Sequence, residues 1–239
     1  MTSKLFILFI ILLPVLGFSQ VSPSIDLIAG LDYSYRTLNS ELLDGNRTRE
    51  TGKLNWRGGL NYNQPITSQF FLKTGLRLAS VGYKGENNTD VRWPSENNGG
   101  TWVPDPALPR ELQLIYDYWF LEIPIAARWE MNNKKVIPFF ELGIAPSIYM
   151  TTKTISKTEL GRTTQLERNS FPTFNKVHFV GLAAFGINYV ISDYLQVFGQ
   201  PTARYHITGT SRSSVNENLF NIGLELGLRK KLGKKSVEK

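Results

Sequence analysis

Cysteine is absent from the sequence, and histidine occurs only twice in 239 residues. Without cysteine the chain can form no disulfide scaffold and offers no thiolate to a metal ion. A metal site would need His178 and His206 together with a carboxylate, and the sequence does not place these groups side by side. We therefore expect no metal, no cofactor and no catalytic residue, and we interpret the chain as a non-enzymatic protein.

Long apolar runs are absent after residue 20, which excludes an ordinary helical membrane protein. The N-terminal stretch MTSKLFILFIILLPVLGFSQ combines the cationic Lys4, an apolar run at 5–15 and small residues before the cleavage point. This pattern predicts a secretory signal peptide at 1–19. The apolar part is about fifteen residues long, whereas a spanning helix needs roughly 20.

Acidic residues are outnumbered, since 27 lysines and arginines against 20 aspartates and glutamates give a net charge of +7. Much of the excess lies near the C-terminus, in a basic tail that we place at 233–239. A solvated tail explains this charge, so we expect no nucleic-acid partner. The remaining residues, 20–232, suit one domain of the larger all-β kind.

The stretch YWFLEIPIAARWE, at 118–130, alternates apolar residues with a mixed set that includes Glu122 and Arg128. A period of two indicates a β-strand with two unlike faces. Pro124 cannot donate to a β-ladder, so we expect a bulge or kink beside it.

Seven further segments repeat this alternation, and the connections between them are long and short by turns. Such an order predicts an up-and-down meander with tight turns at one end and large loops at the other. We therefore predict an all-β fold, an eight-stranded antiparallel up-and-down transmembrane β-barrel. The seven segments are 24–36, 53–63, 69–82, 137–150, 176–191, 194–208 and 218–230.

Alternation alone does not separate a lipid-facing barrel from a soluble lipocalin-like binder, whose apolar face points inward. The face opposite the apolar one is rich in glycine and alanine, as a narrow eight-stranded interior requires. It also carries charges of both signs, which can pair and fill the interior. We predict that this interior network contains Arg57, Lys73, Arg77, Glu122, Arg128, Glu141, Arg204 and Glu225.

Aromatic residues lie at strand ends. Trp119 and Trp129 are ten positions apart on one face, a span of roughly 25 Å along the membrane normal for a strand tilted by about 40°. This span matches the height of a lipid-facing band, so we predict that Trp56, Trp119, Trp129 and Tyr189 contribute to aromatic girdles at its borders.

The longest connection, YKGENNTDVRWPSENNGGTWVPDPALPRELQ, contains Trp93 and Trp102 among prolines and glycines. On an outer loop these rings are candidates for stacking on a sugar or for gripping a partner. The alternative is that they pack on each other or on the barrel rim.

The stretch LEIPIAARWEMNNKKVIPFFELGIAPSIYM, followed by FVGLAAFGINYVISDYLQVFGQPTARYHITG, resembles the outer-membrane β-barrel domain common in Bacteroidota, the PorT-like group. The resemblance covers about 25–232. It implies a barrel in the outer membrane of a Gram-negative bacterium, and PorT itself is associated with type IX secretion and gliding.

We expect a barrel with a filled interior that contacts outer-membrane lipid and acts as a binding or structural component through its outer loops or its periplasmic face. A protein partner in the cell envelope fits this interpretation. The alternative is an outer-membrane lipid-modifying enzyme of the lipid A deacylase type, suggested by His206 and Thr208, two positions apart on one face.

Overall fold

The computed structural model describes residues 21–39, 50–131, 133, 135–167, 175–209 and 216–233. The expected signal peptide at 1–19 and residues 234–239 of the basic tail lie outside these ranges. The regular structure of the described residues is almost entirely β-strand, with one short 3-10 turn, η3 (Pro94–Glu96). No helix in this part of the chain has the length and apolar character needed to cross a membrane.

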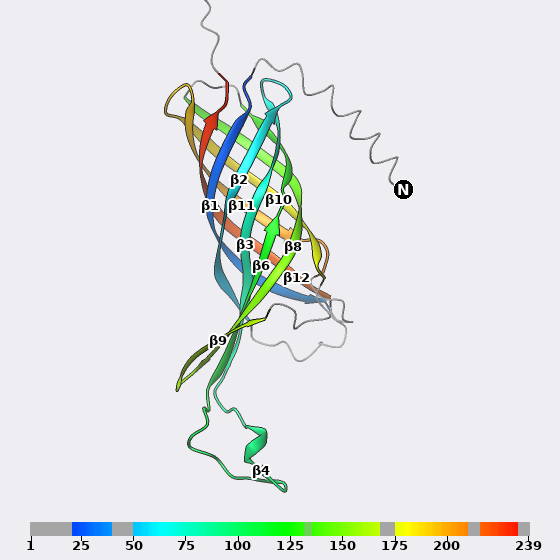
Figure 1. Cartoon of the computed structure of the whole chain (residues 1–239), viewed down its shortest axis with the longest axis vertical. Helices are drawn as coiled ribbons and strands as arrows, with labels where there is room; N and C mark the ends of the chain where they lie inside the picture. The colour runs from blue at the N-terminus through cyan, green and yellow to red at the C-terminus, as the bar shows by residue number, and fades with distance from the viewer. Residues whose placement is uncertain are drawn as a thin grey trace, which may run out of the picture.

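The strands form a closed antiparallel ring of eight positions, which confirms the predicted fold class (Figure 1). Each strand pairs with the next, β12 closes onto β1, and β6 and β7 lie end to end between β3 and β8 as one position. The ring consists of β1 (Ser24–Asn39), β2 (Thr51–Pro65), β3 (Phe70–Asn88), β6 (Leu112–Glu122), β7 (Ile125–Glu130), β8 (Val136–Thr158), β10 (Val177–Val190), β11 (Leu195–His206) and β12 (Asn216–Lys231).

The first residue of β1, Ser24, pairs with the last residue of β12, Lys231, so the start of the first strand and the end of the last strand lie at the same end of the barrel. The short turns that follow β2, β7 and β10 lie at this same end, and the long connections lie at the other. The alternation of long and short connections is therefore as predicted. We call the two ends the terminal end and the loop end.

Three strands continue past the loop end of the barrel as a twisted projecting ribbon, which we define as 83–117 and 151–167 (Figure 1). The ribbon contains the outer parts of β3, β6 and β8, together with β9 (Gly161–Glu167), which pairs with β8. Its tip carries η3, β4 (Asn97–Asn98) and β5 (Thr101–Trp102). The sequence interpretation, which placed the loop-end limits of these strands at 82, 118 and 150, was wrong here.

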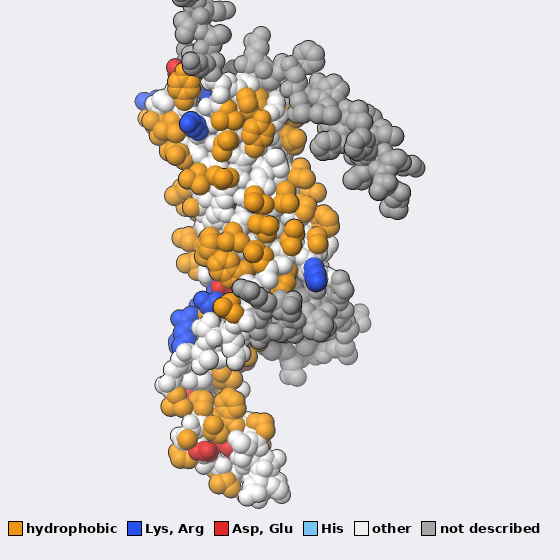
Figure 2. Space-filling model, in the orientation of Figure 1, with side chains coloured by type: hydrophobic (Ala, Val, Ile, Leu, Met, Phe, Trp, Pro, Cys, Tyr) orange, Lys and Arg blue, Asp and Glu red, His pale blue; other side chains and the backbone are white. Residues whose placement is uncertain are grey.

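Side chains alternate between the interior and the outer wall. On β1, Asp26 and Asp32 are 0% and 1% exposed, whereas Leu27 and Leu31 are 58% and 56% exposed. Glu122 likewise points inward. Apolar side chains cover most of the visible barrel wall (Figure 2). Apolar residues therefore face outward and ionic residues face inward, the reverse of a soluble lipocalin-like barrel.

Pro124 interrupts the strand without changing its register. Glu122 pairs with Arg77 and Ile125 pairs with Thr74, so the count along β3 is the same on both sides of the gap. The Ile123 N–H still donates to the Pro146 carbonyl oxygen, at 2.9 Å. The register shift lies earlier in the strand, between Trp119 and Phe120.

Candidate functional site: a filled interior and a projecting ribbon

Among the described residues, twelve buried charged side chains, six cationic and six anionic, are joined to one another inside the barrel by ten ion pairs within 4 Å. We call these residues the ionic network. All eight residues that the sequence suggested for the interior belong to it and are 0–4% exposed. The network consists of Asp26, Asp32, Arg57, Lys73, Arg77, Glu122, Arg128, Glu130, Glu141, Arg204, Glu225 and Arg229.

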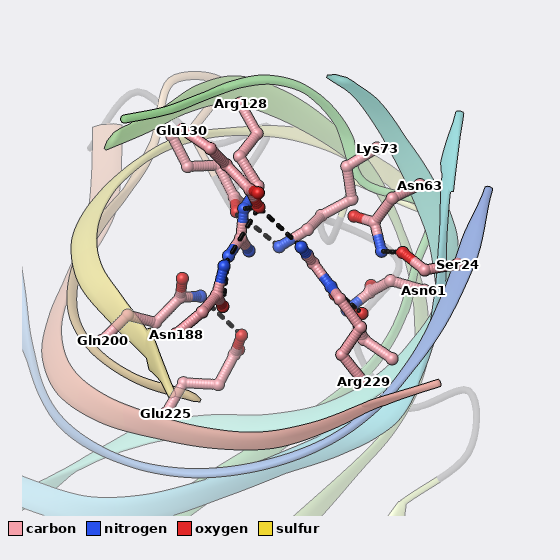
Figure 3. A network of polar contacts seen from close by, with 12 residues as sticks. Ser24, Asn61, Asn63, Lys73, Arg128, Glu130, Asn188, Gln200, Glu225 and Arg229 are labelled. Atoms are coloured by element: carbon pink, nitrogen blue, oxygen red, sulfur yellow. Dashed lines mark hydrogen bonds and ion pairs between the residues drawn. The ribbon is translucent and has the colours of Figure 1, made fainter. Parts of the chain in front are cut away.

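One half of the ionic network lies toward the terminal end, and its residues Arg128, Glu130 and Arg229 point toward one another across the barrel interior (Figure 3). Arg229 joins two carboxylates, with Nε 2.7 Å from Asp26 Oδ1 and Nη1 2.5 Å from Glu130 Oε1. Arg128 donates to Glu130 at 2.8 Å, and its guanidinium lies 3.4 Å from the centroid of the Phe139 ring. These contacts connect strands β1, β7, β8 and β12 through the middle of the barrel.

The other half lies toward the loop end and centres on Arg57. Arg57 donates to Asp32, to Glu225 Oε2 at 2.8 Å and to Thr202 Oγ1 at 2.8 Å. Arg204 pairs with Glu122 and approaches Asp32 at 3.4 Å. Each of these cations thus contacts more than one polar group, which compensates for its removal from water.

Glu130 and Arg229 were missing from the eight candidates drawn from the sequence, and so were Asp26 and Asp32. The signal of the two aspartates was present, because they alternate with Leu27 and Leu31 on the first strand. With these residues the ionic network contains as many cations as carboxylates, and an eight-stranded barrel leaves little space beyond its side chains.

His178 and His206 come together at the loop side of the ionic network. Their ring centroids are 6.1 Å apart, and both rings contact Phe120, at 5.3 Å and 5.5 Å. His206 is fully buried inside the barrel, and Thr208 Oγ1 accepts a hydrogen bond from the Phe179 N–H at 2.9 Å. The pair suggested for lipid deacylation therefore does not meet at the outer wall. The described residues contain no cluster of three or more metal-ligating side chains.

The four candidate girdle residues belong to the outer face of the ring. Trp56 and Tyr189 are 42% and 43% exposed, and Trp119 and Trp129 are partly exposed. The Trp56 and Trp119 rings meet edge to face with centroids 5.3 Å apart, an arrangement that aromatic pairs favour.

The ribbon tip is organised around Glu96, which is 4% exposed. Its carboxylate accepts hydrogen bonds from Arg110, at 2.5 Å and 2.9 Å, and from the backbone N–H groups of Asp105 and Trp93, at 2.8 Å and 3.0 Å. The Arg110 hydrogen bond, followed by the two backbone donors, lowers the pKa of Glu96 to about 2. A single carboxylate thus holds together both sides of the tip.

The two candidate tryptophans of the tip differ in their surroundings. Trp93 donates its indole N–H to the Pro109 carbonyl oxygen at 2.7 Å, so this ring helps to hold the tip. Trp102 is 40% exposed beside Val103, which is 57% exposed, and the Arg92 guanidinium lies 5.7 Å from its ring centroid. Of the two rings, Trp102 is the one that remains open to a partner.

A cavity of about 630 Å³ lies where the ribbon leaves the barrel. Tyr83 and Tyr116 line it with ring centroids 5.1 Å apart, and the Arg36 guanidinium lies 4.1 Å from the Tyr83 ring centroid. Glu50 forms an ion pair with Arg36 at its edge. The loop end therefore combines aromatic and polar groups in a concave surface.

No protein-family profile matches the chain. No curated protein matches it either. Among solved structures, Neisserial surface protein A has 11% identity over 88% of this chain and 97% of its own, with a TM-score of 0.45. The Pseudomonas aeruginosa outer membrane protein OprG has 10% identity over 90% and 97%, with a TM-score of 0.49. Ail of Yersinia pestis has 10% identity over 87% and 98%, with a TM-score of 0.39.

Proposed function

We propose that this chain is a non-enzymatic β-barrel of the Gram-negative outer membrane that anchors a projecting ribbon and binds a partner at the cell surface. The observation that carries the proposal is the combination of a filled interior with a ribbon that extends well beyond the barrel. A filled barrel offers no wide path for solutes, so the function is assigned to the surface that it displays.

The outer wall supports the membrane position. Large apolar side chains such as Leu54, Phe185 and Leu226 are 63%, 65% and 59% exposed, and exposed apolar side chains occur at each of the eight positions of the ring. Water penalises so extensive an apolar surface, whereas the hydrocarbon of a bilayer accepts it. Outer-membrane barrels have short periplasmic turns and long outer loops. We therefore assign the terminal end to the periplasm and the ribbon to the exterior.

The ribbon tip is the proposed contact surface. Trp102 and Val103 present apolar area next to Arg92, a composition that is common in protein-binding surfaces. The Glu96–Arg110 pair fixes the backbone beneath them, so little conformational freedom is lost on binding. The resemblance to the PorT-like group favours a partner in a secretion apparatus, and that part of the proposal rests on sequence motifs alone.

Membrane fractionation and planar bilayers test the barrel part. We expect the protein in the outer-membrane fraction and negligible conductance after reconstitution. Recovery from the soluble periplasm without detergent, or stable channels of nanosiemens size, would overturn it.

Photo-crosslinking in intact cells tests the contact surface. A photoreactive amino acid at Trp102 is expected to give a discrete protein adduct, whereas the same group at Tyr205 on the barrel wall is expected to give none. If neither position, or both positions equally, produce the adduct, the tip is not the contact surface.

A further inference from the structure

An apolar groove of about 650 Å³ crosses the outer wall over β10, β11, β12 and β1. Its floor includes the paired residues Phe198 and Gly227, whose side-chain positions face the barrel interior, where the buried Phe198 ring occupies the space that a Gly227 Cβ would take. Its walls are outward side chains, among them Tyr189, Leu226 and Leu228. The groove is thus a depression in an otherwise convex apolar surface.

Two small residues create this depression. Ala29 on β1 and Gly199 on β11 both pair with Leu226 on β12. Across these three neighbouring strands, a large side chain is therefore flanked on each side by a small residue. A Cβ on Gly199 would lie 3.4 Å from Leu226 Cδ2, which is ordinary contact. A larger side chain at 199 therefore fits sterically and would fill the groove.

Two lysines border the terminal end of the groove. Lys230 is the next outward residue after Leu228 on β12, and the Lys135 ammonium lies 5.6 Å from the centroid of the Tyr189 ring beside β10. The Lys135 carbonyl oxygen accepts a hydrogen bond from the Val190 N–H at 3.0 Å, which fixes this position. Strands β10 and β11 lie between the two backbones, which gives a separation of about 14 Å for three strand spacings.

Both lysines are exposed, and no ion pair within the described residues involves either of them. The turn between β10 and β11 carries one acid, Asp193, which also forms no ion pair there. The terminal end of the groove therefore has two available positive charges, while the groove itself is apolar.

We infer that the groove and the two lysines form a site for one anionic phospholipid of the periplasmic leaflet. An acyl chain lies in the groove, and the phosphate lies between Lys135 and Lys230 at headgroup depth. The inference rests on the membrane position proposed above. An acyl chain suits the groove because it opens sideways onto the band of exposed apolar side chains, and cations near a leaflet surface attract anionic headgroups.

Native mass spectrometry of the full mature chain in detergent tests the site. Phosphatidylglycerol and phosphatidylcholine are titrated separately onto wild type, Gly199→Leu and Lys135→Gln/Lys230→Gln. We expect one phosphatidylglycerol to bind more tightly than phosphatidylcholine, with a loss of about fivefold in affinity for each lysine removed. Gly199→Leu is expected to lose the bound lipid of either kind, because the chain no longer fits.

Two controls separate the site from general effects. Lys157→Gln/Lys176→Gln removes the same charge at the loop end, and Ala127→Leu places the same leucine side chain on the outer wall away from the groove. Both are expected to bind as wild type does. Equal binding of the two lipids by wild type, or equal losses in control and test variants, would overturn the inference.

A separate measurement tests the proposed membrane position. Heat-modifiable migration on gels reports whether each variant is a folded, detergent-inserted barrel. A chain that folds only in water without detergent refutes the membrane position, whereas an inserted barrel without lipid preference refutes the site alone.

Discussion

Arg57 on β2 and Glu225 on β12 form an ion pair over Gly30 of the intervening strand β1, with Arg57 Nε 2.8 Å from Glu225 Oε2. Gly30 pairs with both residues, and a Cβ at this position would lie 3.2 Å from Arg57 Nε. The missing side chain on β1 thus leaves the space in which the two charges meet. Small and charged residues of the interior act together.

Replacing Glu225 with leucine tests the energetic role of the ionic network. The change leaves Arg57 and Arg77 without a shared carboxylate, and removing one partner of a buried pair is expected to lower the free energy of unfolding by about 3–5 kcal/mol. Urea unfolding of the refolded barrel, followed by tryptophan fluorescence, measures the loss. Glu86→Leu removes an exposed acid and serves as the control. Equal midpoints for the two variants would contradict the prediction.

Gly30→Val tests the space above β1. The added side chain overlaps the path of the Arg57 guanidinium and presses on the Leu224 carbonyl oxygen, 3.1 Å from the Cβ position. We expect a loss of about 1–3 kcal/mol, as for other overpacked interiors. Gly181→Val is the matched control, because its Cβ would meet only the movable end of Ile207 at 3.3 Å and a more distant carbonyl. A control as unstable as the test variant would refute the steric explanation.

Hydrophobic alternation was sufficient to predict the closed barrel and the direction of its side chains, because a period of two assigns each residue to one face. Hydrophobic alternation could not predict which interior side chains contact one another. Arg204 pairs with Glu122, which lies 82 positions earlier in the chain, and this meeting depends on the stagger of the strands around the ring. The face on which a side chain lies follows from its neighbours in the sequence, whereas its partner across the barrel depends on residues far away in the sequence.

The projecting ribbon was missed for a different physical reason. Beyond the barrel most side chains of these strands are at least partly exposed and polar residues stand on both faces, so no regular alternation marks the continuing β-ladder. Thr154 and Ser156 are examples of polar residues that pair on both sides within β8. Trp93 and Trp102 looked equivalent in the sequence, whereas in the structure Trp93 donates a hydrogen bond to Pro109 and Trp102 is 40% exposed.

Ile144→Lys tests whether the outer wall of the barrel faces lipid or water. Ile144 is 46% exposed and pairs with Ile125, midway between the two tryptophans of the predicted girdle strand. In a bilayer a lysine near the midplane is expected to destabilise the barrel by about 2–4 kcal/mol. Leu166→Lys changes a residue of the ribbon that is 70% exposed, and there we expect little effect. Unfolding titrations in lipid vesicles compare the two, and equal stabilities would count against a membrane-embedded wall.

Acidification is expected to disorder the ribbon tip by protonating Glu96. Hydrogen bonds from Arg110 and two backbone N–H groups lower the pKa of this carboxyl from 4.5 to about 2 in the folded tip. A lowered pKa means that the ionised form stabilises the fold, so this contribution is complete above about pH 4.5 and is lost as the pH falls toward 2. The indole N–H resonance of Trp93, which donates to Pro109, reports the transition by NMR.

Glu96→Gln is the companion variant, since a neutral amide keeps the size of the side chain and removes its charge. We expect its Trp93 resonance to be displaced already at neutral pH and to change little between pH 6 and pH 2, because the group that titrates is gone. The resonances of tryptophans on the barrel wall, such as Trp56, are expected to stay unchanged over this window in both proteins. A wild-type tip that changes near pH 4.5, or a variant that retains the full wild-type transition, would show that the Glu96–Arg110 pair does not hold the tip together.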